Sequence, residues 1–264
     1  MLYYPQLTSG SVSQYPVARA MNLRAIVNQM LGGDTIRAVD SGAETVQWQL
    51  QYEALTDIEW SSIDQLFEAA EGRLTAFTFL DPTNNLLLWS EDWTKSPWVA
   101  DPLIALAGGI TDPFGATNAM QVTNNAQTTQ RVMQPTAGPS QYRYAFSVYL
   151  RADTPCTIDF AVSTTGQDWT TPVNLGTAWA RMSASVALAT AQDGVQFGIQ
   201  LPAGFQVYAF GAQAEAQPAA GPYKSTTDLA GVYSTARFDS DSLSRISTAP
   251  NQNSGVVKLM SELA

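Results

Sequence analysis

Apolar and polar side chains alternate in short stretches along most of this 264-residue sequence. The clearest stretch is residues 45–53, TVQWQLQYE, where every second side chain is large and apolar. A period of two places these side chains on one face of a β-strand and the polar side chains on the other. Because such a face has to be covered by another layer, the sequence predicts a mainly β protein built from packed sheets.

One helix is predicted, over residues 57–70. Thr56 and Glu59 have the spacing of a capping box, in which two side chains satisfy free N–H groups at the start of a helix. Gly72 is a residue type common just after a helix end. Between these signals the apolar residues repeat at helical spacing: Ile63, Leu66, Phe67 and Ala70. A strand over residues 74–80 and a hairpin of residues 23–30 and 35–39 complete this part of the prediction.

From about residue 85 to 225 the sequence changes to short alternating stretches rich in Thr, Gln, Gly and Pro. Turn-forming pairs such as Gly138-Pro139 and Asp193-Gly194 separate these stretches, which is typical of an antiparallel sandwich or jelly roll. The strands expected to turn an apolar face inward lie at residues 142–150, 158–162, 182–188 and 195–201.

The segment after residue 228 is too short for an independent core. It carries apolar stretches at 232–243 and 256–263, so we expect it to complete another domain. The predicted organisation is therefore an α+β domain of residues 1–85 and 228–264, which is a β-barrel or sandwich with one flanking α-helix. An inserted antiparallel β-sandwich of residues 86–227 interrupts this domain.

The sequence contains no histidine and a single cysteine, Cys156. The absence of histidine removes the commonest general base, the Ser-His-Asp and Cys-His pairs and the usual transition-metal ligand. One cysteine cannot form an intrachain disulfide or a Cys-based zinc site, and the adjacent Glu91 and Asp92 fall short of the ligands that calcium needs. We therefore expect no metal and no cofactor.

Charge and hydropathy exclude further classes of protein. The net charge of −10 argues against a nucleic-acid partner. Because no window approaches the roughly 20 apolar residues that span a bilayer, we expect no membrane insertion. Catalysis by paired carboxylates is still possible, since glycosidases need only Asp and Glu. Asp239 and Asp241 are a candidate pair, because they share one face if their segment is a strand. We interpret this pair as turn and interface residues and expect no enzyme.

Several short motifs lie in the first and last parts of the chain, and their order along the sequence is informative. They are an Arg-rich strand pair (Arg19, Arg24, Arg37), the strand with Trp48, EGR at 71–73, AFTFLDPTNN at 76–85 and RFDSDSL at 237–243. In this order they resemble the distal tail proteins of siphophages and gene transfer agents. The resemblance implies a hexameric ring of copies of this chain in the virion, at the tail tip or baseplate, with tail tube and tail hub proteins as partners. The protein would be made in the host cytoplasm.

A second group of motifs lies in the middle of the chain. It consists of NLLLWSEDWTKSPW at 85–98, DPFGAT at 112–117, YRYAFSVYLRA at 142–152 and AFGAQAEAQPAAGPYKST at 209–226. These stretches resemble the jelly-roll, carbohydrate-binding-like modules of phage tail and fibre proteins. The resemblance implies that the inserted module contacts host-surface polysaccharide.

Trp169 is the first candidate for glycan contact, because TTGQDWTTP reads as a loop and an exposed tryptophan in a loop indicates binding. Gln167, Asp168 and Tyr142 are predicted to join it. A second group, Trp89, Trp93 and Trp98, has two interpretations: an aromatic platform for a sugar face, or packing residues of the first strands. We favour packing, which is the usual role of large aromatic side chains.

Arg73 and Arg237, with Asp239 and Asp241, are candidates for a ring interface, and the alternative is ordinary surface solvation. The leading hypothesis is a ring-forming tail protein whose module binds host glycans. Two alternatives stay open. One is a purely structural tail protein with a non-binding decoration domain, and the other is a carboxylate-based polysaccharide depolymerase.

Overall fold

The computed structural model describes residues 1–40 and 42–263, and it confirms the mainly β fold class. The chain forms two compact units, and each is discontinuous in sequence. The first unit contains Met1–Leu7, Ser13–Phe79 and the chain from Tyr233 onward. The second contains Thr8–Val12 and Leu80–Val232. No helix in the described part of the chain is long and apolar enough to cross a membrane.

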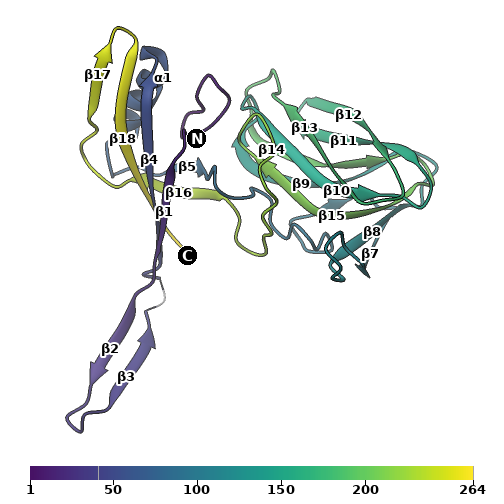
Figure 1. Cartoon of the computed structure of the whole chain (residues 1–264), viewed down its shortest axis with the longest axis horizontal. Coiled ribbons are helices and arrows are strands. Elements are labelled where there is room, and N and C mark those ends of the chain that lie inside the picture. Colours follow the sequence, from purple (N-terminus) through teal and green to yellow (C-terminus); the bar gives the residue numbers. More distant parts are fainter. Residues whose placement is uncertain (41, 264) are drawn as a thin grey trace. The chain divides into compact units, whose positions relative to one another are not determined.

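The first unit is built on a six-stranded sheet in the order β1-β4-β18-β16-β5, with β17 beside β18 (Figure 1). The C-terminal strand β18 pairs antiparallel with β4, and β4 also pairs with β1. The C-terminal strand β18 therefore lies at the centre of this sheet, between β4 and β16. The bounds are β1 (Val17–Asn22), β4 (Thr45–Leu55), β5 (Phe77–Leu80), β16 (Val232–Phe238), β17 (Arg245–Ala249) and β18 (Gln252–Glu262).

The predicted alternation in β4 is confirmed, because its large apolar side chains are all buried: Val46, Trp48, Leu50 and Tyr52. The predicted helix is confirmed to within one residue as α1 (Asp57–Ala69), and its first turn has the complete Thr56–Glu59 capping box. The helix buries Trp60 against β18. Gly255 in β18 lies where any side chain would collide with Trp60, so this glycine permits the close approach.

The predicted hairpin is confirmed as β2 (Ala25–Gln29) and β3 (Thr35–Val39), which form a two-stranded sheet of their own. All residues of both strands are exposed. The exposed side chains include apolar ones on both faces of the hairpin: Ile26, Val27, Ile36 and Val39.

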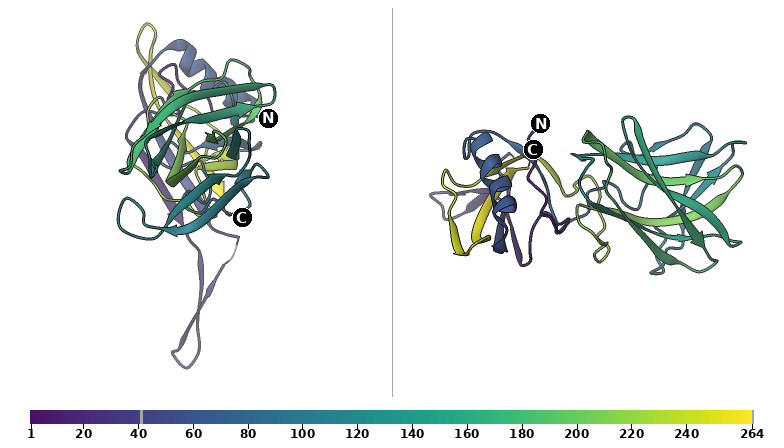
Figure 2. Two further views of the ribbon diagram at one scale, coloured as in Figure 1. Left: turned by 90° about the vertical axis from the view of Figure 1, so that its right-hand side faces the viewer. Right: turned by 90° about the horizontal axis from the view of Figure 1, so that it is seen from above.

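The second unit consists of two five-stranded antiparallel sheets packed face to face (Figure 2). One sheet has the order β13-β10-β15-β8-β7 and the other β12-β11-β14-β9-β6. This is the antiparallel sandwich that the middle of the sequence predicts. The bounds are β6 (Val99–Ala100), β7 (Ile104–Ile110), β8 (Ala119–Asn124), β9 (Gln130–Pro139), β10 (Tyr144–Arg151), β11 (Cys156–Thr164), β12 (Gln167–Leu175), β13 (Ala180–Val186), β14 (Asp193–Leu201) and β15 (Gln206–Glu215).

Aromatic side chains from facing sheets fill the sandwich. Phe146 of β10 lies 4.9 Å from Phe160 of β11 and 6.0 Å from Phe197 of β14, measured between ring centroids. The predicted inward side chains of 195–201 are all buried, and those of 142–150 are buried except Tyr142, which is half buried. In 182–188 only Val186 and Leu188 are buried. Where the chain enters this unit, Asn85 is also buried, and its amide donates to the carbonyl of Ala212 at 2.9 Å.

Candidate functional site

Trp89 lies in an opening segment of the second unit, residues 85–98, and its backbone is in the left-handed region with φ of +48°. This conformation is unfavourable for a bulky residue, so the surrounding contacts have to hold it. The N–H of Trp89 donates to the carbonyl of Thr227 at 2.8 Å, and its own carbonyl accepts from the indole of Trp98 at 3.1 Å. These bonds leave the Trp89 ring half exposed.

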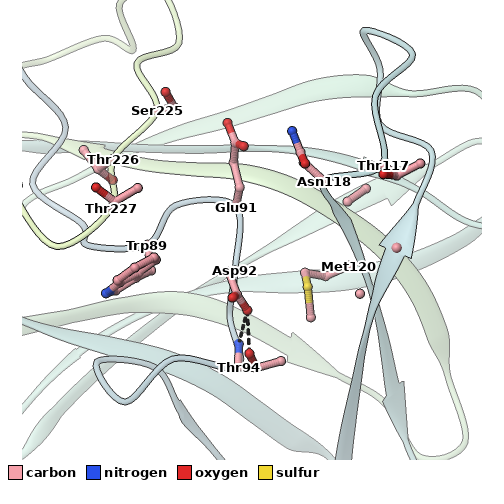
Figure 3. A pocket seen from close by; sticks show the side chains of 13 residues that line it. Trp89, Glu91, Asp92, Thr94, Thr117, Asn118, Met120, Ser225, Thr226 and Thr227 are labelled. Carbon is pink, nitrogen blue, oxygen red and sulfur yellow. Dashed lines mark hydrogen bonds between the residues drawn. The ribbon is translucent and has the colours of Figure 1, made fainter.

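The Trp89 ring lines a pocket of about 500 Å³. Three parts of the second unit form its walls: the opening segment, the β7–β8 region, and a closing segment of residues 225–227. Figure 3 shows Glu91 and Asp92 between the Trp89 side and the wall with Asn118 and Met120. The closing segment is held because the N–H of Thr226 donates to Oγ of Ser90 at 2.9 Å.

Both carboxylates of the pocket have defined partners. The hydroxyl of Tyr223 donates to Oε1 of Glu91 at 2.9 Å. Burial is the main cause that raises the pKa of Tyr223, and the nearby Glu91 charge adds to it, so this hydroxyl remains a donor. The hydroxyl and N–H of Thr94 donate to Asp92 and lower the pKa of that carboxyl, with a further contribution from Lys95.

The chemistry of this pocket suits a sugar. An indole ring offers a flat apolar surface for the C–H groups of a pyranose, while carboxylate and amide groups bind its hydroxyls. The volume lies within the range of pockets that hold small ligands. Lys95 contacts two residues that line the pocket, with Nζ 5.0 Å from the Trp89 ring centroid and 3.6 Å from a carboxylate oxygen of Asp92. The two acidic side chains disfavour an anionic ligand.

Trp169 does not lie in a loop, so the predicted placement is wrong. It belongs to β12, an edge strand that begins after a turn of two residues. Trp169 is half buried and shares the core-facing side of β12 with the buried Val173, whereas Asp168 points to the opposite face. The turn is shorter than the sequence suggested, because the strand pairing extends to Gln167.

The structure therefore does not bring the four predicted glycan residues into one cluster. Asp168 forms an ion pair with Arg131 at 3.1 Å, and Gln167 accepts from the N–H of Thr190 at 3.0 Å. Tyr142 precedes β10 and stacks on Tyr144 with ring centroids 6.5 Å apart. Glycan contact at Trp169 stays a prediction.

The three tryptophans of the opening segment have different roles. Trp93 and Trp98 are buried and stacked, with centroids 4.6 Å apart, which confirms the packing interpretation for these two. Trp89 is half exposed and lines the pocket. The sequence contains a local signal, a tryptophan followed closely by two carboxylates. It does not show the closing segment that completes the pocket.

The four predicted interface residues lie near one another in the first unit. Arg73 and Asp241 form an ion pair of 3.1 Å, and hydrogen bonds from Arg73 lower the pKa of Asp241. Arg237 donates to the carbonyl of Leu74, and the N–H of Asp239 donates to the carbonyl of Lys258 at 2.9 Å. Both aspartates follow the end of β16, in agreement with the interpretation as turn residues, and they do not share a face of a strand. Their role between subunits stays a prediction.

In the described part of the chain no group of three or more acidic or cysteine side chains is arranged to hold a metal ion. The carboxylate of Asp92 is already engaged by Thr94 and Lys95.

No family model matches the sequence, and a search of curated proteins finds no match. Solved structures with some likeness include the enzymatically active domain of bacteriophage CBA120 tailspike protein 4, at 8% identity and a TM-score of 0.39. That match covers 52% of this chain and 22% of the tailspike chain. The chain therefore spans under a quarter of that protein's length.

Carbohydrate-binding domains show a similar level of likeness. The CBM22-1 xylan-binding domain of Paenibacillus barcinonensis Xyn10C has 12% identity and a TM-score of 0.42, over 53% of this chain and 99% of that domain. TmCBM61, solved with β-1,4-galactotriose, has 14% identity and a TM-score of 0.37, over 49% of this chain and 97% of that one. These values are too low to assign a ligand or an activity to this chain.

Proposed function

We propose that this chain is a structural component of a phage-type tail tip, a ring-forming distal tail protein whose second unit binds host-surface glycans. The observation that carries the glycan-binding part is the pocket in which Trp89 lies beside Glu91 and Asp92. An exposed indole with two acceptor carboxylates offers both stacking and hydroxyl recognition. Several copies in one particle would turn weak single contacts into firm attachment.

Binding to an array of bacterial surface polysaccharides tests the pocket, with the full chain carrying Trp89→Ala or Glu91→Gln. We expect Trp89→Ala to weaken binding at least tenfold, or about 1.4 kcal/mol. Trp169→Ala, which removes another half-exposed tryptophan of the same unit, tests the site predicted from the sequence in the same assay. If Trp169→Ala abolishes binding and Trp89→Ala does not, the binding site lies at β12 instead.

The hairpin of β2 and β3 supports the ring-forming part. A two-stranded hairpin is marginally stable by itself. Burial of its exposed apolar side chains against another protein surface would stabilise it. Val39 is 76% exposed, and apolar side chains are exposed on both faces. In a closed ring each copy offers the same surface to its neighbour, so one hairpin per chain provides a repeated contact.

Negative-stain imaging and light scattering test the assembly. We expect rings from the native chain and smaller species from the double variant Ile36→Lys with Val39→Lys. The melting temperature of the separate chain should hardly change, because both side chains are exposed within it. The control is Leu229→Lys, which changes an exposed apolar residue of the second unit. Rings that persist in the double variant would exclude the hairpin as the contact.

We propose no catalytic role for the chain. Asp241 is paired with Arg73, an arrangement that suits a structural contact. A polysaccharide depolymerase would release new reducing ends from capsular polysaccharide. If the purified native chain releases new reducing ends and an Asp239→Asn variant does not, the chain has a catalytic role and this part of the proposal is wrong.

A further inference from the structure

Aromatic side chains also gather on the outward face of the sheet β13-β10-β15-β8-β7. Tyr149 of β10 and Phe210 of β15 are directly paired across the two strands, with ring centroids 6.0 Å apart. Tyr223 lies 6.1 Å from Tyr149 and 5.5 Å from Phe210. Phe114 completes this aromatic cluster, at 5.6 Å from Tyr149 and 5.9 Å from Phe210.

Phe114 is the most exposed member of the aromatic cluster, with 68% of its surface accessible. The turn that carries it is rigid. The buried carboxylate of Asp112 accepts from the N–H groups of Phe114 at 2.8 Å and Ala116 at 3.2 Å. Gly115 follows with φ of +91°, a conformation that favours glycine. A large ring held outward in this way is typical of a contact residue.

The outward face continues along β10 from Tyr149 to Arg151, two residues further on the same side. The guanidinium of Arg151 lies 3.9 Å from the ring centroid of Tyr208 and 5.3 Å from that of Trp179. Arg151 also pairs with Asp153 at 3.4 Å, and Tyr208 donates to Asp153 at 2.9 Å. This part of the face therefore combines the flat rings of Tyr208 and Trp179 with hydrogen-bonding groups, and the charge of Arg151 is balanced by that of Asp153.

The aromatic cluster borders the Trp89 pocket. Tyr223 connects the two, since its ring packs on Phe210 and its hydroxyl donates to Glu91, which lines the pocket. The β7–β8 connection joins them as well, because Phe114 is followed three residues later by Thr117, which lines the pocket. A ligand longer than one sugar therefore has a continuous surface to follow.

We infer that this outward face is a second subsite for a polysaccharide chain of neutral sugars, which runs from the Trp89 pocket across Phe114 and Tyr149. The inference rests on the proposed glycan binding of the second unit. Rings separated by polar groups suit sugars, which present apolar C–H faces and hydroxyls in turn. Neutral sugars fit because Arg151 is paired with an acid, the pocket is acidic and the chain carries a net charge of −10. The second cation of this face, Arg181 beside Tyr149, already donates to the Gly221 carbonyl and the Ser147 hydroxyl.

The test uses the full chain and calorimetry. The probes are the disaccharide and the hexasaccharide of whichever polysaccharide of the bacterial array binds the native chain. We expect Phe114→Ala to weaken hexasaccharide binding about tenfold and to leave disaccharide binding unchanged, because only the longer ligand reaches the aromatic cluster. Phe114→Tyr keeps a ring and should retain affinity. Leu103→Ala is the control, since Leu103 is another exposed apolar residue of this unit.

The two proposals fail in different ways. If no polysaccharide binds the native chain, the proposed glycan binding fails and the second subsite with it. If Trp89→Ala weakens both ligands while Phe114→Ala changes neither, or changes both equally, the pocket stands and the second subsite is wrong. Stronger binding of acidic than of neutral polysaccharides would overturn the assigned class of ligand. Near-ultraviolet circular dichroism checks that each variant is folded.

Discussion

At the scale of single residues, backbone geometry distinguishes Trp89 from the tryptophans near it. Trp93 and Trp98 each donate an indole N–H to a backbone carbonyl and are buried. Trp89 has a positive φ and lines the pocket, where Figure 3 shows its ring. A strained residue beside a cavity is a common feature of functional sites, because the surrounding structure has to maintain it.

Tyr52 offers a prediction about pH at the same scale. Burial raises its pKa to about 12 from an ordinary value of 10.0, and its hydroxyl lies 2.8 Å from that of Tyr4. Below pH 10 the phenol is neutral in both the folded and the unfolded chain. Between pH 10 and 12 only the unfolded chain loses the proton, so the free energy of unfolding should fall by roughly 3 kcal/mol.

Urea unfolding followed at several alkaline pH values measures this effect. In Tyr52→Phe the free energy of unfolding should fall less between pH 10 and 12, because the contribution of Tyr52 is absent. Other tyrosines still titrate in this range. Tyr15→Phe is the control, because Tyr15 is largely exposed in the same unit. Equal alkaline slopes for the native chain and Tyr52→Phe would show that burial does not perturb this phenol.

At the scale of elements, local signals control the start of α1. Oγ1 of Thr56 accepts from the N–H of Glu59 at 3.2 Å, and the Glu59 carboxylate accepts from the N–H of Thr56 at 3.0 Å. We expect Thr56→Ala to lower the free energy of unfolding by about 1 kcal/mol, because the N–H of Glu59 loses its acceptor. Gln65→Ala, on the exposed side of the helix, should change it by less than about 0.5 kcal/mol. Similar losses in both variants would mean that the cap is not stabilising.

Strand ends were harder to predict than strand centres. The alternation within β4 and β10 gave the buried faces, because a buried face demands apolar side chains at every second position. The start of β12 depends instead on its pairing with β11, a tertiary contact that extends the strand to Gln167. This extension is why Trp169 is in a strand and half buried.

At the scale of the whole molecule, the two ends of the second unit meet. The N–H of Asp81 donates to the carbonyl of Gly231 at 2.8 Å, so a short linker can replace the chain between them. We expect a chain with residues 82–230 replaced by a short Gly-Ser linker to keep the first unit folded, because β5 and β16 remain intact. It should lose all glycan binding.

Circular dichroism and thermal unfolding of this shortened chain measure the outcome. Since Thr8–Val12 packs with the second unit, the shortened chain also carries Val12→Ser to avoid exposing a buried apolar side chain. The full chain with Val12→Ser is the control. Loss of cooperative unfolding in the shortened chain, but not in this control, would show that the first unit depends on the second.

The sequence by itself determined the mainly β class, the capped helix, the presence of the hairpin and the buried faces of the main strands. Each depends on residues close together in the chain, where periodicity and capping act directly. The pocket was decided only by the tertiary structure. Ser90 and Thr226, which hold its walls together, are 136 residues apart in the sequence. No local sequence pattern predicts that they are in contact. The tryptophan that lines the pocket was therefore recognisable only in the structure, where these segments lie together.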